Sequence, residues 1–269
     1  MRPVGLVAAN AVVRRLDATL GIEGRPQSGT GQTSLLTGRN AAEEMGRHFG
    51  PWVPTPVRET LRQHSLFRVG KDRGLTIAFA NAYPAGHFRP QGHGTRRPGA
   101  FPFAAHAADL LNRDESSIHR GEGVASSITT EAWRRYVDPE APIVAADEAG
   151  RTLARIAAGH DLTIFAHYDT DHAGHTGEIE KAREVVARLD AFLGGLLETM
   201  ADGTLVLVTS DHGNVEDMST GHTLNDVPLI AFGPGAEPLT VGARSLLDVA
   251  PLILGVLERS GRSADLEGS

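Results

Sequence analysis

Aspartate and histidine side chains gather in three short segments in the second half of the chain. Residues 167–175 contain three histidines and two aspartates, Asp211 and His212 are adjacent, and His222 follows shortly after. Carboxylate oxygens and imidazole nitrogens are ligands of divalent cations. Gly213 permits the sharp backbone turn that would let both Asp211 and His212 face one ion. These residue types therefore predict metal chemistry.

Spacing separates the ligand candidates from their neighbours within residues 167–175. Asp171 and His175 are four residues apart, so they lie on the same side of a helical turn, and Gly174 allows another segment to approach closely. The remaining histidines and aspartate are expected to support the ligands or to stay outside the site; they are His167, Asp169 and His172. The alternatives are a solvated acidic loop for this segment and a structural role for His222.

A hydroxyl nucleophile could come from the glycine-rich turn in residues 26–39. Ser28 and Thr30 both stand where this turn opens a predicted helix. Free backbone N–H groups and the helix dipole favour an anion such as phosphate there. A metal ion can lower the pKa of a nearby hydroxyl enough to make it a nucleophile. The alternative is that Ser28 or Thr30 only caps the helix.

Strands and helices must position these side chains. Short apolar runs predict buried strands, and apolar residues at every third or fourth position predict helices. The predicted strands are residues 75–80, 162–166, 204–209 and 227–232. The predicted helices are residues 32–47, 148–158, 178–200 and 246–259. This alternation predicts a mostly parallel sheet, covered by helices on both faces, with sites at the carboxyl ends of its strands.

Prolines and glycines interrupt the pattern in the middle of the chain. We interpret residues 85–147 as an inserted cap or lid with one short helix at residues 104–112. The core is then discontinuous and comprises residues 1–84 and 148–269.

The two ends of the chain are expected to differ. The apolar stretch near the N-terminus is short for the core of a signal peptide. The alternative is a helix, and residues 4–16 are predicted to be helical. Residues 260–269 are polar and are predicted to be disordered.

The composition excludes several classes of function. The chain has 269 residues, no cysteine and a formal net charge of −7. Without cysteine it holds no disulfide framework, thiolate metal site or cysteine nucleophile. No run approaches the ~20 apolar residues that cross a bilayer, and no long basic run favours nucleic acid. We expect a cytoplasmic protein that binds neither membranes nor nucleic acid.

Four motifs follow one another in a specific order. They are Asp171-x-x-Gly174-His175, Asp211-His212-Gly213-Asn214, His222-Thr223-x-Asn225-x-Val227-Pro228 and Asp248-Val249-Ala250-Pro251. Over residues 20–60 and 160–255 the chain resembles the metalloenzyme domain of the alkaline phosphatase superfamily, and most closely the cofactor-independent phosphoglycerate mutases. In that superfamily the nucleophile lies ten residues before the glycine of a similar helix-ending motif. Counting back ten residues from Gly38 gives Ser28 rather than Thr30.

The resemblance implies a fold and a set of ligands. The fold would be a three-layer α/β/α sandwich with a mostly parallel sheet and a small inserted cap. Two divalent cations, Mn²⁺ or Zn²⁺, would be bound. One would be held by Asp171, His175 and His222, and the other by Asp211, His212 and the Ser28 hydroxyl. Arg39 and Asn214 would be candidates either to support the metal ligands or to contact the phosphate.

The implied reaction is phosphoryl transfer from a small phosphorylated substrate, most simply phosphomonoester hydrolysis through a phosphoserine on Ser28. Two alternatives stay open. One is mutase-like isomerisation, although the predicted insertion is too short to supply the large second domain of the mutases. The other is a non-catalytic, degenerate metal-binding protein.

One part of the superfamily pattern is not found before Ser28. Family members place a further aspartate ligand in an Asp-Gly pair that ends the first strand. The 27 residues before Ser28 contain one aspartate, Asp17, which Ala18 follows. We therefore expect this strand and its ligand to be missing, either through a start codon assigned too late or through degeneration. The strands at residues 162–166 and 204–209 would then have unpaired edges, and the metal near Ser28 would bind more weakly than the other.

Overall fold

The computed structural model describes residues 11–88 and 97–267, with side chains up to residue 259. These residues form a mixed α/β fold, as predicted. The strands are β1 (Val12–Leu16), β2 (Ile77–Phe79), β3 (Leu162–Ile164), β4 (Val206–Thr209) and β5 (Val227–Phe232). The helices are α1 (Ser28–Thr37), α2 (Ala41–Met45), α3 (Arg58–His64), α4 (Leu66–Asp72), α5 (Ala100–Ala107), α6 (Glu115–His119), α7 (Glu131–Tyr136), α8 (Ala146–Ala157), α9 (Asp169–Thr176), α10 (Ile179–Thr199), α11 (Ala236–Thr240) and α12 (Val249–Glu267).

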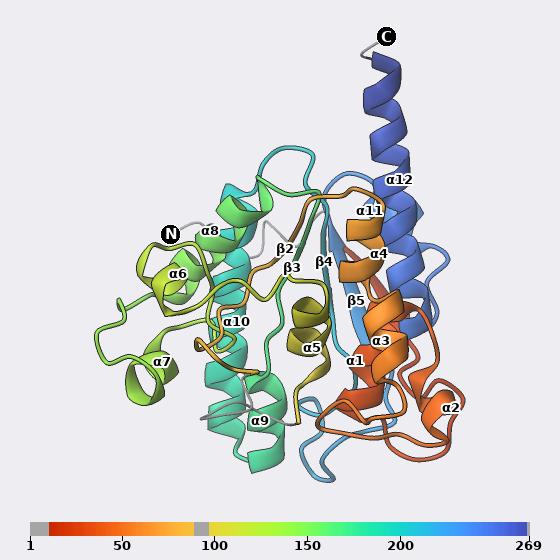
Figure 1. Ribbon diagram of the computed structural model, residues 1–269. Helices are drawn as coiled ribbons and strands as arrows, with labels where there is room; N and C mark the ends of the chain where they lie inside the picture. The colour runs from red at the N-terminus through yellow and green to blue at the C-terminus, as the bar shows by residue number, and fades with distance from the viewer. Residues whose placement is uncertain (1–10, 89–96, 268–269) are drawn as a thin grey trace.

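The described strands form two sheets at the centre of the molecule (Figure 1). β2 and β3 pair in parallel, whereas the sheet ordered β1-β5-β4 is antiparallel throughout. The predicted mostly parallel sheet is therefore wrong for the larger sheet. Parallel neighbours need a long crossover connection, usually a helix. Residues 210–226 contain no helix and turn the chain back beside β4, so that Val206 pairs with Phe232.

β1 occupies residues that we predicted to be helical. It pairs with β5 along its whole length. More and less exposed residues alternate along the strand, and Leu16 is fully buried. Its two valines are β-branched and fit such a half-buried strand. The helix prediction is wrong for Val12–Leu16, and residues 4–10 lie outside the described residues.

β3 and β4 are edge strands within the described part of the chain. β3 pairs only with β2, and β4 pairs only with β5. All residues of both strands are half-buried, although the strands are mostly apolar and lie near the centre of the molecule. An edge strand presents unpaired backbone N–H and C=O groups. Among the described residues, the strands at 162–166 and 204–209 thus have the unpaired edges that were predicted.

Helices cover both faces of β2. Ile77 and Phe79 pack into a core with residues of α1, α3, α4, α5 and α12. Ala78, which points to the opposite face, packs with residues of α8 and α10. Figure 1 shows the two groups of helices on opposite sides of the strands. The core that positions the site is therefore built from both ends of the chain.

Helix boundaries follow local signals in some places and not in others. The predicted helix at residues 32–47 is divided, because Gly38 ends α1 in the left-handed region, with φ of 69°. α8 and α10 agree with their predicted ranges to within two residues. α12 continues to Glu267, so the predicted disorder of the tail is wrong up to that residue.

The segment interpreted as a cap is divided between two cores. α5 packs against α1, α3 and α4, and Ala100 and Ala104 belong to the main core. The helix expected at residues 104–112 thus begins earlier and is buried. A separate small cluster lies around α6 and α7 and consists of Ala82, Ile118, Ala125, Trp133 and Ala141.

Glycines let α8 and α10 pack backbone against backbone. A Cβ atom on Gly195 would lie 2.0 Å from the carbonyl oxygen of Asp147, whereas one on Gly194 would meet nothing within 4 Å. We expect Gly195→Ala to destabilise the protein by about 1–3 kcal/mol, because the helices must separate. Gly194→Ala should stabilise it by up to about 1 kcal/mol, because alanine is the better helix former. Thermal melting measures both changes, and equal melting temperatures for the two variants would contradict this packing.

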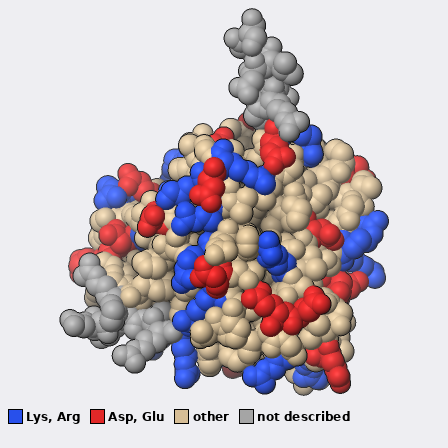
Figure 2. Space-filling view, turned by 45° about the vertical axis from the view of Figure 1, so that its right-hand side comes forward, with Lys and Arg blue, Asp and Glu red and all other residues tan. Residues whose placement is uncertain are grey.

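The surface carries charges of both signs. Figure 2 shows acidic and basic side chains interspersed on one face, with neither sign forming a continuous patch. Among the described residues, no helix has the length and apolar character needed to cross a membrane.

Candidate metal centre

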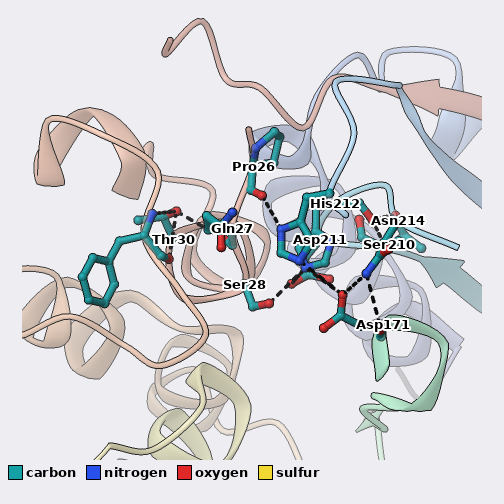
Figure 3. Close-up of polar contacts among 12 residues, drawn as sticks. Pro26, Gln27, Ser28, Thr30, Asp171, Ser210, Asp211, His212 and Asn214 are labelled. Atoms are coloured by element: carbon teal, nitrogen blue, oxygen red, sulfur yellow. Dashed lines mark hydrogen bonds and ion pairs between the residues drawn. The ribbon is translucent and has the colours of Figure 1, made fainter. Parts of the chain in front are cut away.

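Ser28 begins α1 and faces the segment that follows β4 (Figure 3). Its side chain is buried, and its Oγ lies 2.9 Å from Nε2 of His212. Gln27 occupies the N-cap position, and it makes no side-chain capping bond. The Ser28 hydroxyl is therefore directed to a candidate metal ligand, and capping does not account for it.

Two glycines of α1 allow this close approach. A Cβ atom on Gly31 would lie 2.8 Å from the carbonyl oxygen of Asp211, and one on Gly29 would lie 2.2 Å from that of Trp52. Larger residues at either position would push α1 away from its neighbours. The glycine-rich sequence thus lets the first turns of α1, which begins at Ser28, pack directly against Asp211.

Thr30, the other hydroxyl candidate, has a structural role. Its Oγ1 lies 3.2 Å from the carbonyl oxygen of Gln27 and accepts the backbone N–H of Phe49 at 3.1 Å. The residue is fully buried, and in Figure 3 it lies on the side of the helix away from His212. Thr30 fixes the loop around Phe49, which leaves Ser28 as the hydroxyl that faces the site.

Asp171, His175 and His222 form what we call the first ligand set. Oδ1 of Asp171 lies 3.4 Å from Nε2 of His175 and 3.3 Å from Nε2 of His222. The two Nε2 atoms are 3.0 Å apart. Ligands about 2.0–2.1 Å from a tetrahedral cation are separated by about 3.3 Å. The spacing of these three atoms therefore suits one cation such as Zn²⁺.

His222 is oriented by the backbone. Its Nδ1 lies 2.7 Å from the carbonyl oxygen of Pro26, so Nδ1 donates and Nε2 is left free to bind a metal. Burial alone lowers the pKa of His222, but contact with Asp171 and the Pro26 carbonyl raises that pKa above its ordinary value. No sequence signal marks Pro26, because a backbone carbonyl is available at every residue.

Asp211, His212 and Ser28 form the second ligand set. Nε2 of His212 lies 3.6 Å from Oδ2 of Asp211 and 2.9 Å from Oγ of Ser28. Oδ2 of Asp211 is buried and has no hydrogen-bond partner. An unpaired buried carboxylate oxygen is costly unless a cation satisfies it. This orphaned oxygen therefore fits a metal ligand.

The two ligand sets adjoin each other. The ligand atoms of Asp171, His212 and His222 all lie within 4.8 Å of one another. The rings of His212 and His222 are stacked, with their centroids 3.8 Å apart. The structure thus brings together all the predicted ligands, from α1, from α9 and from the segments before and after Gly213.

Asn214 supports Asp171, which is one of the two roles expected for it. Its Nδ2 donates to Oδ1 of Asp171 at 2.5 Å and to the backbone carbonyl of Asp171 at 3.1 Å. A Cβ atom on Gly174 would lie 2.3 Å from Oδ1 of Asn214, so this glycine makes room for the amide. Burial raises the pKa of Asp171, but hydrogen bonds from His222 and Asn214 hold that pKa well below its ordinary value. Asp171 is therefore ionised at neutral pH.

Arg39 lies outside the site. It follows Gly38 at the far end of α1 and is exposed. A helix rises 1.5 Å per residue, which puts the two ends of this ten-residue helix about 15 Å apart. The structure therefore places Arg39 away from the ligand sets, and it supports neither of the two roles expected for this residue.

The other polar residues around α9 do not join the ligand sets. Asp169 pairs with Arg188 at 3.1 Å, and Nδ1 of His167 lies 2.7 Å from the carbonyl oxygen of Ser126. The His172 side chain is 75% exposed. As the spacing predicted, Asp171 and His175 share one side of the helix and face His222.

Comparisons with known proteins agree with this chemistry. Residues 137–259 match the family model of the Metalloenzyme superfamily, which indicates divalent-metal binding. A 2,3-bisphosphoglycerate-independent phosphoglycerate mutase from Dinoroseobacter shibae is 37% identical over 174 residues, which cover 59% of this chain and 34% of the mutase. The chain therefore spans about a third of the length of this curated relative.

Solved structures show the same fold. A cold-active alkaline phosphatase from the psychrophile Shewanella sp. matches with a TM-score of 0.59 and 14% identity, covering 91% of this chain and 90% of that one. The alkaline phosphatase from the Antarctic bacterium TAB5 matches with a TM-score of 0.57 and 14% identity, covering 93% of this chain and 90% of that one. By sequence the chain is similar to the Metalloenzyme superfamily and to the 2,3-bisphosphoglycerate-independent phosphoglycerate mutases, and its fold is similar to that of the alkaline phosphatases.

Proposed function

We propose that this protein hydrolyses phosphomonoesters through a phosphoserine formed on Ser28. The observation that carries the proposal is the Ser28 hydroxyl, which lies 2.9 Å from His212 beside two sets of metal-ligand atoms. A hydroxyl that only caps a helix has no need of such neighbours. The arrangement supports a nucleophile held where a phosphoryl group can be stabilised.

Each residue has a defined part in the proposed reaction. The N-terminus of α1 attracts the phosphate anion, and Ser28 Oγ forms a bond to phosphorus as the ester oxygen leaves with the alcohol. Water then breaks the Oγ–phosphorus bond, which releases inorganic phosphate and restores the serine. Bound at the two ligand sets, Mn²⁺ or Zn²⁺ would lower the pKa of the hydroxyl and neutralise phosphoryl oxygens. Asn214 holds Asp171 in place throughout.

Finer features belong to the same proposal. Two cations per chain agree with two adjoining ligand sets. Helices on both sides of the strands support a three-layer α/β/α sandwich. We further propose a cytoplasmic location and a small phosphorylated substrate.

Isomerisation of a phosphoglycerate is a second candidate function, because the sequence resembles mutases. The experiment is an assay of purified protein with Mn²⁺ or Zn²⁺, using p-nitrophenyl phosphate, phosphoserine and 3-phosphoglycerate as substrates. We expect metal-dependent release of inorganic phosphate that stops when a chelator is added. Formation of 2-phosphoglycerate without phosphate release would assign a mutase. Metal binding without turnover of any substrate would contradict both reactions and favour the non-catalytic alternative.

A further inference from the structure

The carboxylate of Glu216 connects the two segments that flank the ligand sets. Its Oε2 accepts the backbone N–H of Asn214 at 2.7 Å. Its Oε1 accepts the hydroxyl of Thr223 at 2.5 Å and the side-chain amide of Asn225 at 3.1 Å. Glu216 thus accepts hydrogen bonds from both sides of the loop between β4 and β5, although it touches none of the ligands.

On one side, Glu216 reaches Asp171 through a single intermediate residue, Asn214. The backbone of Asn214 is fixed by Glu216, and its side chain clamps both the carboxylate and the backbone carbonyl of Asp171. A shift of Asn214 would therefore move Oδ1 of Asp171, which lies within 3.4 Å of Nε2 of both His175 and His222.

On the other side, Glu216 reaches His222 through a single intermediate residue, Thr223, which follows His222 in the chain. It holds Thr223, whose backbone N–H donates to the carbonyl of Gly213 at 3.0 Å. A Cβ atom on Gly213 would lie 2.2 Å from Oγ1 of Thr223 and 2.4 Å from Oε1 of Glu216. Glycine at this position is what allows the carboxylate and the hydroxyl to meet.

We propose that Glu216 is a positioning residue for the first ligand set, holding Asp171 through Asn214 and His222 through Thr223. An ionised carboxylate accepts all three hydrogen bonds, whereas an amide replaces one acceptor oxygen with a donor. Groups that orient metal ligands change metal affinity by about 10–100-fold when they are removed. The inference rests on the proposed function only in that it requires the first ligand set to bind a cation.

The test compares Glu216→Ala and Glu216→Gln with Asp217→Asn. Asp217 is the adjacent acid, and among the described residues its carboxylate accepts hydrogen bonds only from Ser219. This control therefore removes the same charge as Glu216→Gln without removing a contact near the ligand sets. Zn²⁺ and Mn²⁺ dissociation constants are measured by competition with a coloured chelator, well below the melting temperature of every metal-free variant. A merely structural role would lower the melting temperature and leave the dissociation constant of the folded protein unchanged.

We expect Glu216→Ala to weaken the binding of the more tightly bound ion, at the first ligand set, by about 10–100-fold. The affinity of Glu216→Gln should be intermediate, and that of Asp217→Asn should match the wild type. Equal affinity in Glu216→Ala and wild type would overturn the proposal, as would an equal loss in Asp217→Asn. A wild-type protein that binds neither ion would overturn the proposed function itself, and this inference with it.

Discussion

Ser28→Ala should lower phosphomonoester turnover by about 10³-fold or more, whereas Thr30→Ala should retain most of it. The Ser28 hydroxyl faces His212, and no other described hydroxyl occupies that position. Thr30 bonds to the backbone of Gln27 and Phe49. The measurement is kcat for p-nitrophenyl phosphate with saturating Mn²⁺ or Zn²⁺.

Stability should rank the two variants in the opposite order. Thr30→Ala leaves the buried N–H of Phe49 without its acceptor and should cost about 1–3 kcal/mol. Ser28→Ala removes one contact to His212 and should change the melting temperature less. A variant can therefore be less stable and still active, or stable and inactive. An active Ser28→Ala protein beside an inactive, folded Thr30→Ala protein would show that the nucleophile is misassigned.

The candidate site was largely predictable because its chemistry lies in short segments next to strands. Apolar runs located β3 and β4, and Asp171 and Asp211 follow soon after them. The four-residue spacing placed His175 on the same face as Asp171. These predictions use only local geometry, which the sequence carries directly.

The pairing of the strands was less predictable, because it depends on contacts distant in sequence. The apolar residues of β4 and β5 are compatible with parallel or antiparallel pairing. Residues 210–226 turn the chain back beside β4, and this makes the pairing antiparallel. Val12–Leu16 becomes a strand because β5 offers a partner more than 200 residues later. The local sequence does not show this distant partner, and a helix was therefore predicted for these residues.

The partners of the supporting residues could not be predicted, for a related reason. Asn214 was expected to support the ligands or to contact the phosphate, but only the folded chain shows that its amide holds Asp171. Glu216 has no motif of its own, and its three partners are visible only in the folded chain. Arg39 was misplaced because ten residues of helix separate it from Ser28.

Asp171→Asn should remove the more tightly bound metal ion, the one at the first ligand set, and should lower phosphomonoester turnover by about 10³-fold. Oδ1 of Asp171 lies 3.4 Å from Nε2 of His175, 3.3 Å from Nε2 of His222 and 3.9 Å from Nε2 of His212, so one charge serves both ligand sets. Losing a ligand should weaken metal binding by more than the about 10–100-fold expected for a supporting residue.

Asp169→Asn is the matched control for this variant. It lies on the same helix, and its side chain is 25% exposed, close to the 30% of Asp171. It loses an ion pair with Arg188 but no contact to the ligand sets. Its metal affinity should match the wild type, and an equal loss in both variants would point to a general effect of charge.

The most direct measurement is anomalous diffraction at the zinc edge from crystals of Zn²⁺-loaded wild type and Asp171→Asn. We predict two adjacent peaks in the wild type, one contacting Asp171, His175 and His222 and the other contacting Asp211, His212 and Ser28. The variant should lose the first peak. Wild-type crystals with zinc bound elsewhere, or with no peak among these residues at saturating Zn²⁺, would contradict the assignment of this site as a metal centre for phosphoryl transfer.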